Sequence, residues 1–363
     1  MNPFLKTSAD GTSEYVTSLG SLNRAVFAQS PLSGIEDGLE GLKFSQIFST
    51  PLIVADIRRV SRFYRLDLSD VPDDRLPRIL DEGLVSDDIR YNQMAERVVK
   101  KFGNRLGLLL LVLRTGEREN RLARPEWDDS CWEYWRNIDT LILTGGLASS
   151  MLGRRFKEQI HNIFDLAGVK PYNITLFENG AYIGIMGIAQ RLMGDDLCAL
   201  GFDLGHTSLK RALVRMDSGI ITGFTPYDTL PSRYMTSRFD TDAEKLASAK
   251  DLHNYIVKAI VSAHRELTSY ADVSDTILIS IANYTDNGVL DNEHGGYAKL
   301  GTLGANYAST LQETLSGELR RSIKVKLVHD ATATALYFSD VPDSVCITLG
   351  TGFGVGYPDI KIR

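Results

Sequence analysis

The sequence of 363 residues contains only three cysteines, and none of them lies in a disulfide or metal-binding pattern. Cys131, Cys198 and Cys346 are scattered, odd in number and outside any C-x-x-C spacing. We therefore expect neither a disulfide framework nor a cysteine zinc site, and this cysteine usage indicates a reducing, cytoplasmic compartment.

Long hydrophobic runs are also missing. The N-terminal segment lacks an apolar core of signal-peptide length, and no later stretch approaches the ~18 apolar residues that cross a bilayer. The longest run, residues 106–113, continues a stripe that passes through Met94, Val98 and Phe102 at three- and four-residue spacing. Such a stripe is typical of an amphipathic core helix, so no membrane partner is expected.

The chain has no excess of positive charge. It carries 40 Lys and Arg against 46 Asp and Glu, which gives a net charge of −6. Binding to a polyanion has no global electrostatic support, so nucleic acid is not an expected partner. Hydrophobic residues make up 43% and charged residues 24%, as in an ordinary globular protein. At roughly 150 residues per domain, the length predicts two domains, with three as the alternative.

Several catalytic motifs do not occur. The P-loop pattern G-x-x-x-x-G-K-[ST], the dinucleotide fingerprint G-x-G-x-x-G, the zinc motif H-E-x-x-H and the hydrolase elbow G-x-S-x-G are all absent. The six histidines are never spaced as a ligand pair on a helix. The sequence therefore gives no support for a P-loop ATPase, a dinucleotide-binding protein, a zinc hydrolase or a serine hydrolase.

What the sequence does contain is an alternation of strand and helix patterns. Short β-prone runs lie at residues 140–143 (TLIL), 276–281 (TILISI) and 325–328, and helical spacing lies at 91–114, 149–164, 242–270 and 306–320. The alternation predicts an α/β protein. The run at 51–57 (PLIVADI) fits either a buried strand or the start of a helix.

Two segments share one arrangement, in which a strand runs into a glycine turn and a second strand comes after it. One is Asp203 with the turn at 204–207, and the other is the glycine-rich stretch 349–356. Glycine lets backbone N–H groups approach a phosphate closely, and Thr and Ser hydroxyls add donors. Taken alone, each turn is more typical of a plain connection between strands.

Together the segments resemble the actin-like, hexokinase and heat-shock ATPase superfamily, and within it the ROK family of sugar kinases and repressors. Residues 203–210 are similar to its first phosphate motif, 349–356 to its second, 141–146 to its adenosine segment, 329–333 to its Asn-Asp-Ala-Asn-Ala segment and 180–193 to its closing helix. The resemblance implies a two-lobed α/β fold of the actin-like ATPase (ribonuclease H-like) type, which binds ATP and Mg²⁺.

The order of these motifs differs from that of the family, because the adenosine segment and the closing helix come first. The cyclic order is kept, so the simplest interpretation is a circular permutation. Residues 1–180 plus 340–363 would then form one discontinuous lobe on the adenosine side. Residues 181–339 would form the other, with the first phosphate motif, the catalytic aspartate and the acceptor site, and the nucleotide is expected between the lobes.

The resemblance assigns roles to two aspartates. Asp203 would hold Mg²⁺ directly or through water, with an Asx turn as the alternative. Asp330 would act as the general base that accepts the proton of the acceptor hydroxyl, although Asp is also a preferred helix N-cap and the two roles are compatible.

The other candidate residues come from the same comparison. The phosphate-binding candidates are Gly205, His206, Thr207, Ser208, Lys210, Gly350, Thr351, Gly352 and Gly354. Gly145 and Gly146 would approach the adenosine. For Lys210, a simple solvated position is as good an interpretation as a phosphate contact.

Departures from the family pattern concern the acceptor. His206 stands where ROK kinases carry a second glycine, His329 replaces the family's asparagine, and both the E-x-G-H segment and the cysteine-rich zinc motif are missing. Sugar recognition is therefore not carried over. The remaining candidates for acceptor contacts are Asn283, Asp286, Glu293, His294 and His329, with a plain surface loop as the alternative.

The sequence therefore predicts an ATP- and Mg²⁺-dependent phosphotransferase, a kinase whose acceptor is a hydroxyl of a small polar molecule such as a sugar or sugar derivative. The alternative is a nucleotide-binding regulator or assembly ATPase that uses the same fold as a switch. A homo-oligomer is compatible with both.

Overall fold

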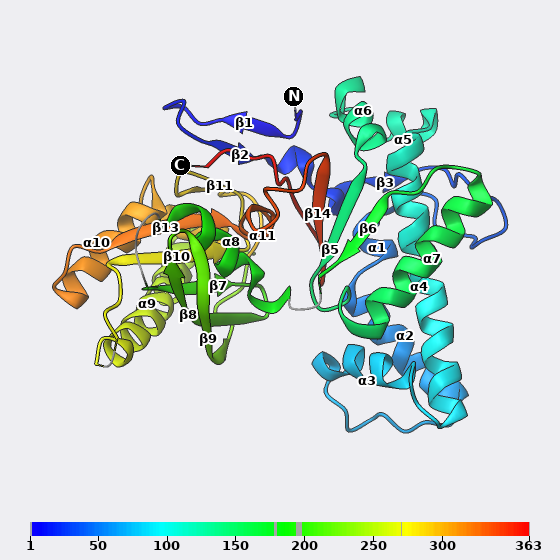
Figure 1. The fold of residues 1–363 in the computed structure, drawn as a ribbon, viewed down its shortest axis with the longest axis horizontal. Coiled ribbons are helices and arrows are strands. Elements are labelled where there is room, and N and C mark those ends of the chain that lie inside the picture. Colours follow the sequence, from blue (N-terminus) through cyan, green and yellow to red (C-terminus); the bar gives the residue numbers. More distant parts are fainter. Residues whose placement is uncertain (1, 178–179, 194–197, 270, 363) are drawn as a thin grey trace. The chain divides into compact units, whose positions relative to one another are not determined.

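The computed structural model describes residues 2–177, 180–193, 198–269 and 271–362, which form a mixed α/β protein (Figure 1). The chain divides into two compact units. Unit 1 comprises Met1–Phe4, Leu19–Ala181 and Pro342–Val355, and unit 2 comprises Leu5–Ser18, Tyr182–Val341 and Gly356–Arg363.

Unit 1 combines a group of helices with a four-stranded sheet and a two-stranded one. Its helices are α1 (Phe44–Ile47), α2 (Thr50–Phe63), α3 (Leu76–Gly83), α4 (Ile89–Thr115), α5 (Arg118–Leu122), α6 (Asp129–Asn137) and α7 (Ser150–Ala167). Its strands are β3 (Val26–Phe27), β4 (Leu42–Lys43), β5 (Thr140–Thr144), β6 (Asn173–Leu176), β14 (Ser344–Leu349) and β15 (Phe353–Gly356). The four-stranded sheet has the order β15-β14-β5-β6, in which β14 and β5, and β5 and β6, run parallel.

The core of unit 1 contains the contact between α4 and α7. The apolar stripe expected at residues 94–113 is buried along α4, which confirms the core helix. A Cβ placed on Gly103 would lie 2.6 Å from the Cβ of Gln159, and one on Gly107 would lie 2.9 Å from the Cβ of Ile163. The two glycines, one turn apart, therefore allow the helices to approach more closely than larger residues would. The ambiguous run at 51–57 forms part of α2.

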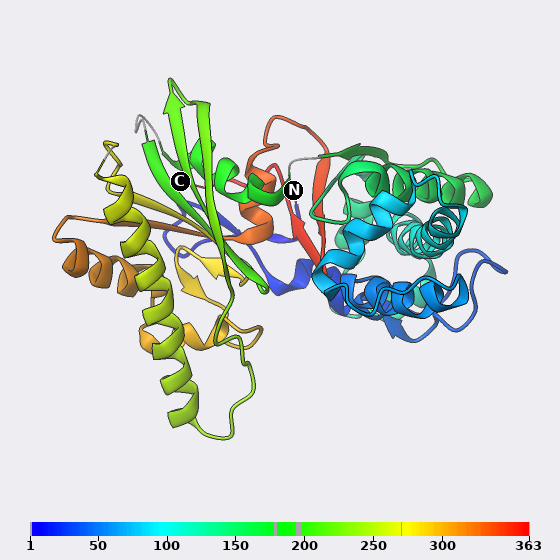
Figure 2. The same ribbon diagram turned by 90° about the horizontal axis from the view of Figure 1, so that it is seen from below.

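Unit 2 is built on a five-stranded sheet (Figure 2). The strands of the whole unit, including two short ladders outside this sheet, are β1 (Leu5–Thr7), β2 (Glu14–Val16), β7 (Cys198–Leu204), β8 (Ser208–Asp217), β9 (Ile220–Pro231), β10 (Thr276–Ile281), β11 (Thr285–Asp286), β12 (Val289–Leu290) and β13 (Lys324–His329). Its helices are α8 (Ile183–Leu192), α9 (Asp242–Leu267), α10 (Tyr307–Leu319) and α11 (Asp330–Leu336). Among the short 3-10 turns, η5 (Ala298–Leu303) belongs to unit 2, whereas η2 (Leu22–Arg24) and η3 (Asp73–Arg75) belong to unit 1. The turns η1 (Ser18–Gly20) and η4 (Gly180–Tyr182) lie at sequence positions where the chain passes from one unit to the other.

The order of the five-stranded sheet is β13-β10-β7-β8-β9. β7, β8 and β9 form an antiparallel meander, whereas β10 runs parallel to β7 and β13 runs parallel to β10. The parallel strands require crossovers, which α9 and α10 provide.

The two faces of this sheet differ because side chains alternate along each strand. Ile277, Ile279 and Ile281 of β10 belong to the core cluster that also contains residues of α9 and α10. Ser280 lies on the opposite face, where a Cβ on Gly184 of α8 would be 3.2 Å from its Oγ. Asp203 is the register partner of Ser280 in β7, so its side chain shares that face.

The termini also pack in unit 2. The N–H of Glu14 donates to the carbonyl of Lys361 at 2.7 Å, and the N–H of Lys361 donates to a carboxylate oxygen of Glu14 at 2.9 Å.

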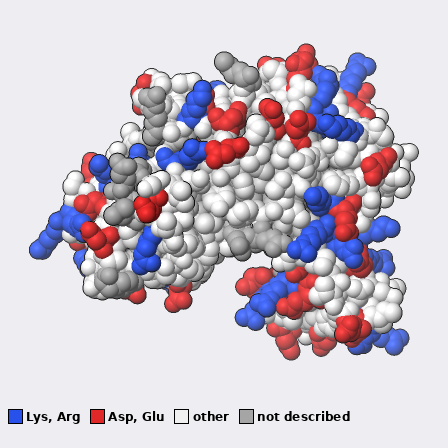
Figure 3. All heavy atoms as spheres, in the orientation of Figure 1, with Lys and Arg blue, Asp and Glu red and all other residues white. Residues whose placement is uncertain are grey.

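None of the described helices is both long and apolar enough to cross a lipid bilayer. On the face drawn in Figure 3, basic and acidic side chains are interspersed. No large area of one sign covers that face, as the mixed charge of the sequence leads one to expect.

Candidate functional site

The candidate site of unit 2 lies where three parallel strands end together. Leu204 of β7 is in register with Ile281 of β10, which is in register with His329 of β13. The residues that come directly after these three strands therefore lie at one edge of the sheet. In α/β proteins, ligands bind outside the carboxyl ends of parallel strands.

Asp203 is held by two side chains from neighbouring strands. Its Oδ2 is 3.0 Å from the Nζ of Lys210 on β8, and its Oδ1 accepts a hydrogen bond of 2.8 Å from the Oγ of Ser280 on β10. These bonds go across the sheet, not to the following backbone as they would in an Asx turn. Lys210 is therefore an ion-pair partner at the site and not a solvated surface lysine; both side chains are largely buried.

The turn at residues 205–208 is braced from inside the protein. The Gly205 carbonyl accepts hydrogen bonds from Ser232 Oγ at 2.7 Å and from Tyr297 Oη at 2.9 Å, and the Gly205 N–H donates to the Ser208 carbonyl. Within the described part of the chain, the backbone N–H groups of the exposed residues His206 and Thr207 have no hydrogen-bond partner. A fixed turn that presents free N–H groups suits an anion.

Asp330 is the first residue of α11, directly after β13. Its Oδ1 accepts a hydrogen bond of 2.7 Å from the Ala331 N–H and lies 3.2 Å from the Nε2 of His329. His329, and not Asp330, is the N-cap residue of this helix. Burial, followed by the charge of Asp203, raises the pKa of Asp330 to about 6, although the side chain stays 39% exposed. The Asp330 carboxyl group thus has a raised pKa and is still accessible to solvent.

The loop of expected acceptor residues lies beside this turn. A Cβ placed on Gly295 would be 3.7 Å from the Cε1 of His206. Asn283 is buried and its amide donates to the carbonyls of Asp291 and His294, at 3.2 and 3.0 Å, so it braces the loop. The backbone N–H groups of Glu293 and His294 donate to the carboxylate of Asp291.

Asp286, another of the expected acceptor residues, is influenced by the N-terminal segment of unit 2. It pairs in the short β11–β12 ladder, and burial together with the charge of Asp10 raises the pKa of its carboxyl group. Asp10 lies in the segment that joins β1 and β2. The Asp286 carboxyl group thus lies within electrostatic range of the segment that joins β1 and β2.

The candidate glycines of unit 1 form a second cluster. Gly145 comes directly after β5 with φ of +92°, and a Cβ there would be 2.4 Å from the carbonyl oxygen of Leu349 at the end of β14. Thr144 and Thr348 join the same strands through their hydroxyls at 2.9 Å. Gly146 has no atom within 4 Å of an added Cβ. The turns after β5 and β14 are therefore packed against each other.

The turn at residues 350–352 is fixed within unit 1. The Gly350 carbonyl accepts a hydrogen bond from the Thr50 N–H at the start of α2, and the Gly350 N–H donates to Gly352. Asn23 donates to the Phe353 carbonyl and accepts from its N–H, both at 2.8 Å. Thr351 is exposed at the tip, and Gly354 lies in β15.

The N-terminus of α7 already has an anionic partner. The Leu152 N–H in its first turn donates to the Oδ1 of Asp81, from α3, at 2.6 Å. A carboxylate thus already uses an N–H group in the first turn of the helix that comes after the glycine pair assigned to the adenosine.

Four glycines place α11 and hence Asp330. A Cβ on Gly187 of α8 would be 2.1 Å from the Ala333 carbonyl oxygen, and one on Gly356 would be 2.0 Å from that of Ala331. A Cβ on Gly201 of β7 would be 2.2 Å from a side-chain carbon of Ile185 in α8, and Gly184 adjoins Ser280. The absence of side chains lets α8 lie between β7 and α11.

Sequence reasoning missed three residues of the site: Ser280, Ser232 and Tyr297. Ser280 had one available signal, since it is a polar residue near the end of the apolar run TILISI. Ser232 and Tyr297 lie in irregular segments, where no periodicity marks a contact with Gly205.

The donor set fits a magnesium ion that arrives with phosphate better than a resident ion. Among the described residues, no group of three or more His, Cys, Asp and Glu side chains is arranged to hold a metal. Asp203 offers one carboxylate at this edge of the sheet. Asp330 is a second one nearby, close enough for the charge of Asp203 to raise the pKa of Asp330. Mg²⁺ commonly uses one or two carboxylates, water and substrate phosphates.

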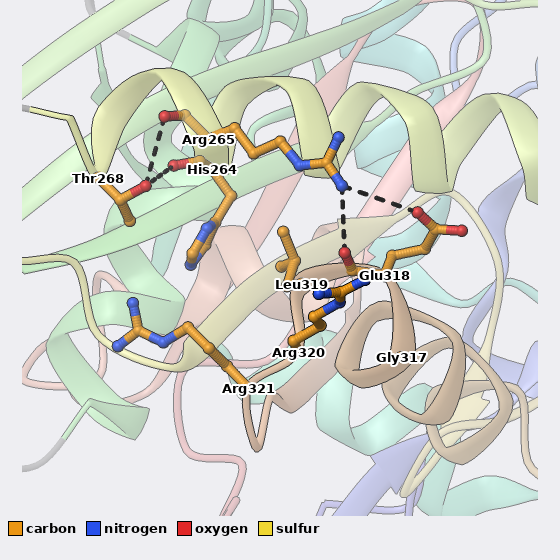
Figure 4. A pocket seen from close by; sticks show the side chains of 8 residues that line it. All are labelled: His264, Arg265, Thr268, Gly317, Glu318, Leu319, Arg320 and Arg321. Atoms are coloured by element: carbon orange, nitrogen blue, oxygen red, sulfur yellow. Dashed lines mark hydrogen bonds and ion pairs between the residues drawn. The ribbon is translucent and has the colours of Figure 1, made fainter.

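A pocket of about 480 Å³ lies elsewhere in unit 2, between the C-terminal turns of α9 and α10 (Figure 4). Arg265 donates to the Glu318 carbonyl at 3.1 Å, and Arg321 pairs with Asp275 at 2.7 Å. These arginines complement helix ends and an acidic side chain, and cations are favoured at helix C-termini. The pocket contains none of the candidate residues.

Comparisons with known proteins give little further information. No family model matches the chain, and no curated protein is similar to it. Among solved structures, it is similar to one described as the PilM-PilN type IV pilus biogenesis complex, at 14% identity and a TM-score of 0.28. The similarity covers 50% of this chain and 49% of that one, so the match spans about half of the other chain. A likeness of this size supports no conclusion about the function of this chain.

Proposed function

We propose that the chain binds a Mg²⁺–nucleoside triphosphate at the strand ends of unit 2 and transfers its terminal phosphoryl group to a hydroxyl of a small polar acceptor. The observation that carries the proposal is the grouping of Asp203, Lys210 and Asp330 beside the turn at 205–208. It supplies anion donors, a cation and a carboxyl group with a raised pKa at one edge of one sheet.

The internal arrangement of the two sheets supports an actin-like fold. In unit 2 the order β8-β7-β10-β13 has a glycine turn between β7 and β8, and β7, β10 and β13 run parallel. In unit 1 the order β15-β14-β5-β6 has a glycine turn between β14 and β15, and β14, β5 and β6 run parallel. Two sheets of matching order are what a fold of two related lobes requires.

The same comparison supports the circular permutation. In unit 2 the chain forms β7 and β8 before β10 and β13, whereas in unit 1 it forms β5 and β6 before β14 and β15. The sheet positions match while the chain order is exchanged. Moving the chain ends from one connection to another produces this difference without changing the packing.

Each residue at the edge of the unit 2 sheet would have its own task. Bound with the nucleotide, Mg²⁺ neutralises phosphate charge and orients the terminal phosphates. Asp203 is the residue that would hold it, Lys210 would provide a positive charge to the phosphates, and the N–H groups of His206 and Thr207 would donate to phosphate oxygens. Catalysis would rest on charge stabilisation and positioning, with little covalent chemistry by the protein.

Asp330 would be the general base. With a pKa of about 6 the carboxyl group is mostly ionised at neutral pH, yet it is more basic than an ordinary aspartate. It would take the proton of the acceptor hydroxyl as that oxygen attacks the terminal phosphorus, while the bond from phosphorus to the leaving diphosphate oxygen breaks. The assignment of a sugar as acceptor rests on the ROK resemblance alone.

A second candidate function is nucleotide hydrolysis by a regulator or assembly ATPase. The donors of the expected acceptor loop favour it, because the side-chain NH₂ group of Asn283 and the backbone N–H groups of Glu293 and His294 are used within the loop. Water would then be the acceptor, and Asp330 would activate it in the same way.

An acceptor panel separates the two functions. ADP release from Mg·ATP is measured without acceptor and with hexoses, amino sugars and polyols. Release that rises with one acceptor and yields its phosphate ester supports the kinase, whereas slow release that no acceptor changes supports the hydrolase. Calorimetry that detects no binding of Mg·ATP would exclude both.

The ion pair at the turn gives a prediction about affinity. Replacing Lys210 with Met is expected to weaken Mg·ATP binding roughly 10-fold, because a charge-assisted hydrogen bond to phosphate is lost. The measurement is the Kd by calorimetry, with Lys250→Met on the exposed face of α9 as the control. Unchanged or tighter binding would show that Lys210 serves only to hold Asp203.

A further inference from the structure

The irregular segment between β9 and α9, residues 232–239, lies against the turn that comes after β7. The N–H of Ser232 donates to the Thr207 carbonyl at 3.1 Å, and the Oγ of Ser232 is one of two donors to the Gly205 carbonyl. The other donor is the Oη of Tyr297, which comes from a different part of the chain. The turn is therefore held from two sides.

The same segment is also held by Lys299 of η5, a residue that is only 2% exposed. The Nζ of Lys299 donates to the carbonyls of Tyr234 and Thr236, to the second at 2.8 Å, and lies 5.4 Å from the centroid of the Phe239 ring. Burial lowers the pKa of Lys299, because a charged amino group loses its hydration there. The two carbonyls take the place of that water, so the amino group and the segment each depend on the other.

The backbone of the segment is bent where it meets Lys299. Tyr234 has φ of +57°, in the left-handed region that a large side chain seldom adopts. The next residue, Met235, packs on Gly296, where an added Cβ would lie 2.7 Å from the Met235 carbonyl oxygen. A strained conformation persists only where the surrounding contacts hold it. At this bend, the hydrogen bonds from Lys299 are such contacts.

Together these contacts close into a cycle. From the Gly205 carbonyl it leads through the Ser232 hydroxyl and along the backbone to Tyr234. The Nζ of Lys299 links Tyr234 to the segment of Tyr297, whose Oη donates back to Gly205. On both sides the two anchoring residues are only two positions apart in the sequence. The short backbone between them has little freedom to absorb the loss of one contact, so such a loss is expected to relax the others.

The cycle fixes the direction of one N–H group of the turn. The Gly205 carbonyl and the His206 N–H belong to the same planar trans peptide unit, in which they point in opposite directions. Because the carbonyl is directed toward Ser232 and Tyr297, the His206 N–H is directed away from them. This N–H has no hydrogen-bond partner among the residues that the structure describes, so only the other end of its peptide unit holds it in place.

We infer that Lys299 is a positioning residue for the anion site of the turn, which it fixes by holding residues 232–239 in place. Ser232 transmits this restraint to the Gly205 carbonyl and so to the His206 N–H, the group that would donate to a phosphate. The inference rests on the proposed function of this turn. A donor that binds the phosphates equally before and during transfer changes affinity and not the rate of the bound complex. Loss of Lys299 is therefore expected to weaken nucleotide binding.

The first measurement follows the His206 N–H in the protein without nucleotide, as its nitrogen-15 order parameter by NMR. Lys299→Met removes the donors and keeps most of the side-chain length, Ser232→Ala cuts the cycle at its other side, and Lys250→Met on the exposed face of α9 is the control. We expect the order parameter to fall from about 0.85, the value of a rigid backbone, toward about 0.6 in the first two variants only. An unchanged value in Lys299→Met would overturn the inference.

The second measurement is a double-mutant cycle on nucleotide affinity. We expect the Kd for Mg·ATP to rise roughly 10-fold in Lys299→Met, with kcat at saturating ATP unchanged. Since Lys299 acts through Ser232, adding Ser232→Ala to Lys299→Met should raise the Kd no further. A residue that only stabilises the fold would give effects that multiply, and that result, or a fall in kcat without a rise in Kd, contradicts the inference. If the wild type binds no Mg·ATP while the order parameters change as described, the positioning role stands and the proposed function fails.

A third measurement covers the case in which Lys299→Met does not fold. Hydrogen exchange of the Lys299 amino group is measured by NMR in the wild type and in Ser232→Ala. Coupling between two contacts is reciprocal, so cutting the cycle at Ser232 should loosen the contacts of Lys299 and speed this exchange. Equal exchange rates in the two proteins would show that the contacts are independent and would refute the positioning role.

Discussion

Replacement of Asp330 by Asn is expected to lower phosphoryl transfer by ~10²–10⁴-fold, the usual contribution of a general base. The amide keeps the volume and the oxygen that accepts from the Ala331 N–H, but it takes up no proton. Affinity for Mg·ATP should stay close to that of the wild type, because the proposed phosphate contacts lie on the turn at 205–208. ADP release and calorimetry measure the two effects, with Asp251→Asn on α9 as the matched control.

The role of Asp330 also predicts how turnover changes with pH. The base is the ionised form, so wild-type turnover should rise between about pH 5 and 7 with a midpoint near the Asp330 pKa of about 6. The residual rate of Asp330→Asn should lack that midpoint. An unchanged turnover in the variant, or a wild-type profile that falls with pH through this range, would remove Asp330 from the reaction.

The same shift predicts the stability of the variant. A carboxyl group whose pKa is higher in the folded than in the unfolded chain costs stability above its folded pKa, and the cost vanishes below the unfolded value. Asp330→Asn should therefore be more stable than the wild type at pH 7, by ~1 kcal/mol once solvent screening is allowed for. The gain should develop from about pH 4 to 6, the interval between the ordinary aspartate pKa of 3.8 and the raised pKa. Denaturant unfolding at a series of pH values measures it.

The regular elements of the fold could be predicted because their patterns are long. The expected helices at 91–114, 149–164 and 242–270 correspond to α4, α7 and α9, and the run TILISI is β10. The helices repeat a spacing over several turns, and β10 is an almost continuous apolar run that is buried along its whole length, which makes both patterns visible. The mixed α/β class can be inferred from them.

β9 could not be predicted because its exposed position leaves no alternation of apolar and polar residues in the sequence. This strand, Ile220–Pro231, is the edge of the sheet and few of its side chains are buried. An edge strand tolerates proline and polar residues on both faces, so it has no alternation to detect. β1 is only three residues long, too short for any periodicity.

The candidate site was only partly visible for a related reason. Asp203 and Asp330 lie at the ends of strand runs, in motifs that the sequence displays directly. Their partners depend on strand register, which is a property of the assembled sheet. The bond from Ser280 to Asp203 exists because β10 lies next to β7, and the contact of Tyr297 with Gly205 joins residues 92 positions apart. No local pattern encodes such pairs.

Replacement of Gly187 by Ala is expected to destabilise the protein by ~3 kcal/mol, at the upper end for overpacking. The added Cβ would lie 2.1 Å from the Ala333 carbonyl oxygen and 2.9 Å from the Tyr337 N, both backbone atoms that no rotamer change can move. α8 must therefore shift away from α11. The midpoint of denaturant unfolding measures the effect.

A matched control comes from Gly317 in α10, where an added Cβ meets no atom within 4 Å. Gly317→Ala should be neutral or stabilising by up to ~1 kcal/mol, because alanine is the better helix former. Since α11 carries Asp330, Gly187→Ala should also lower kcat more than it raises the Kd for Mg·ATP. A Gly187→Ala protein as stable and active as the Gly317→Ala control would mean that α8 does not set the position of α11.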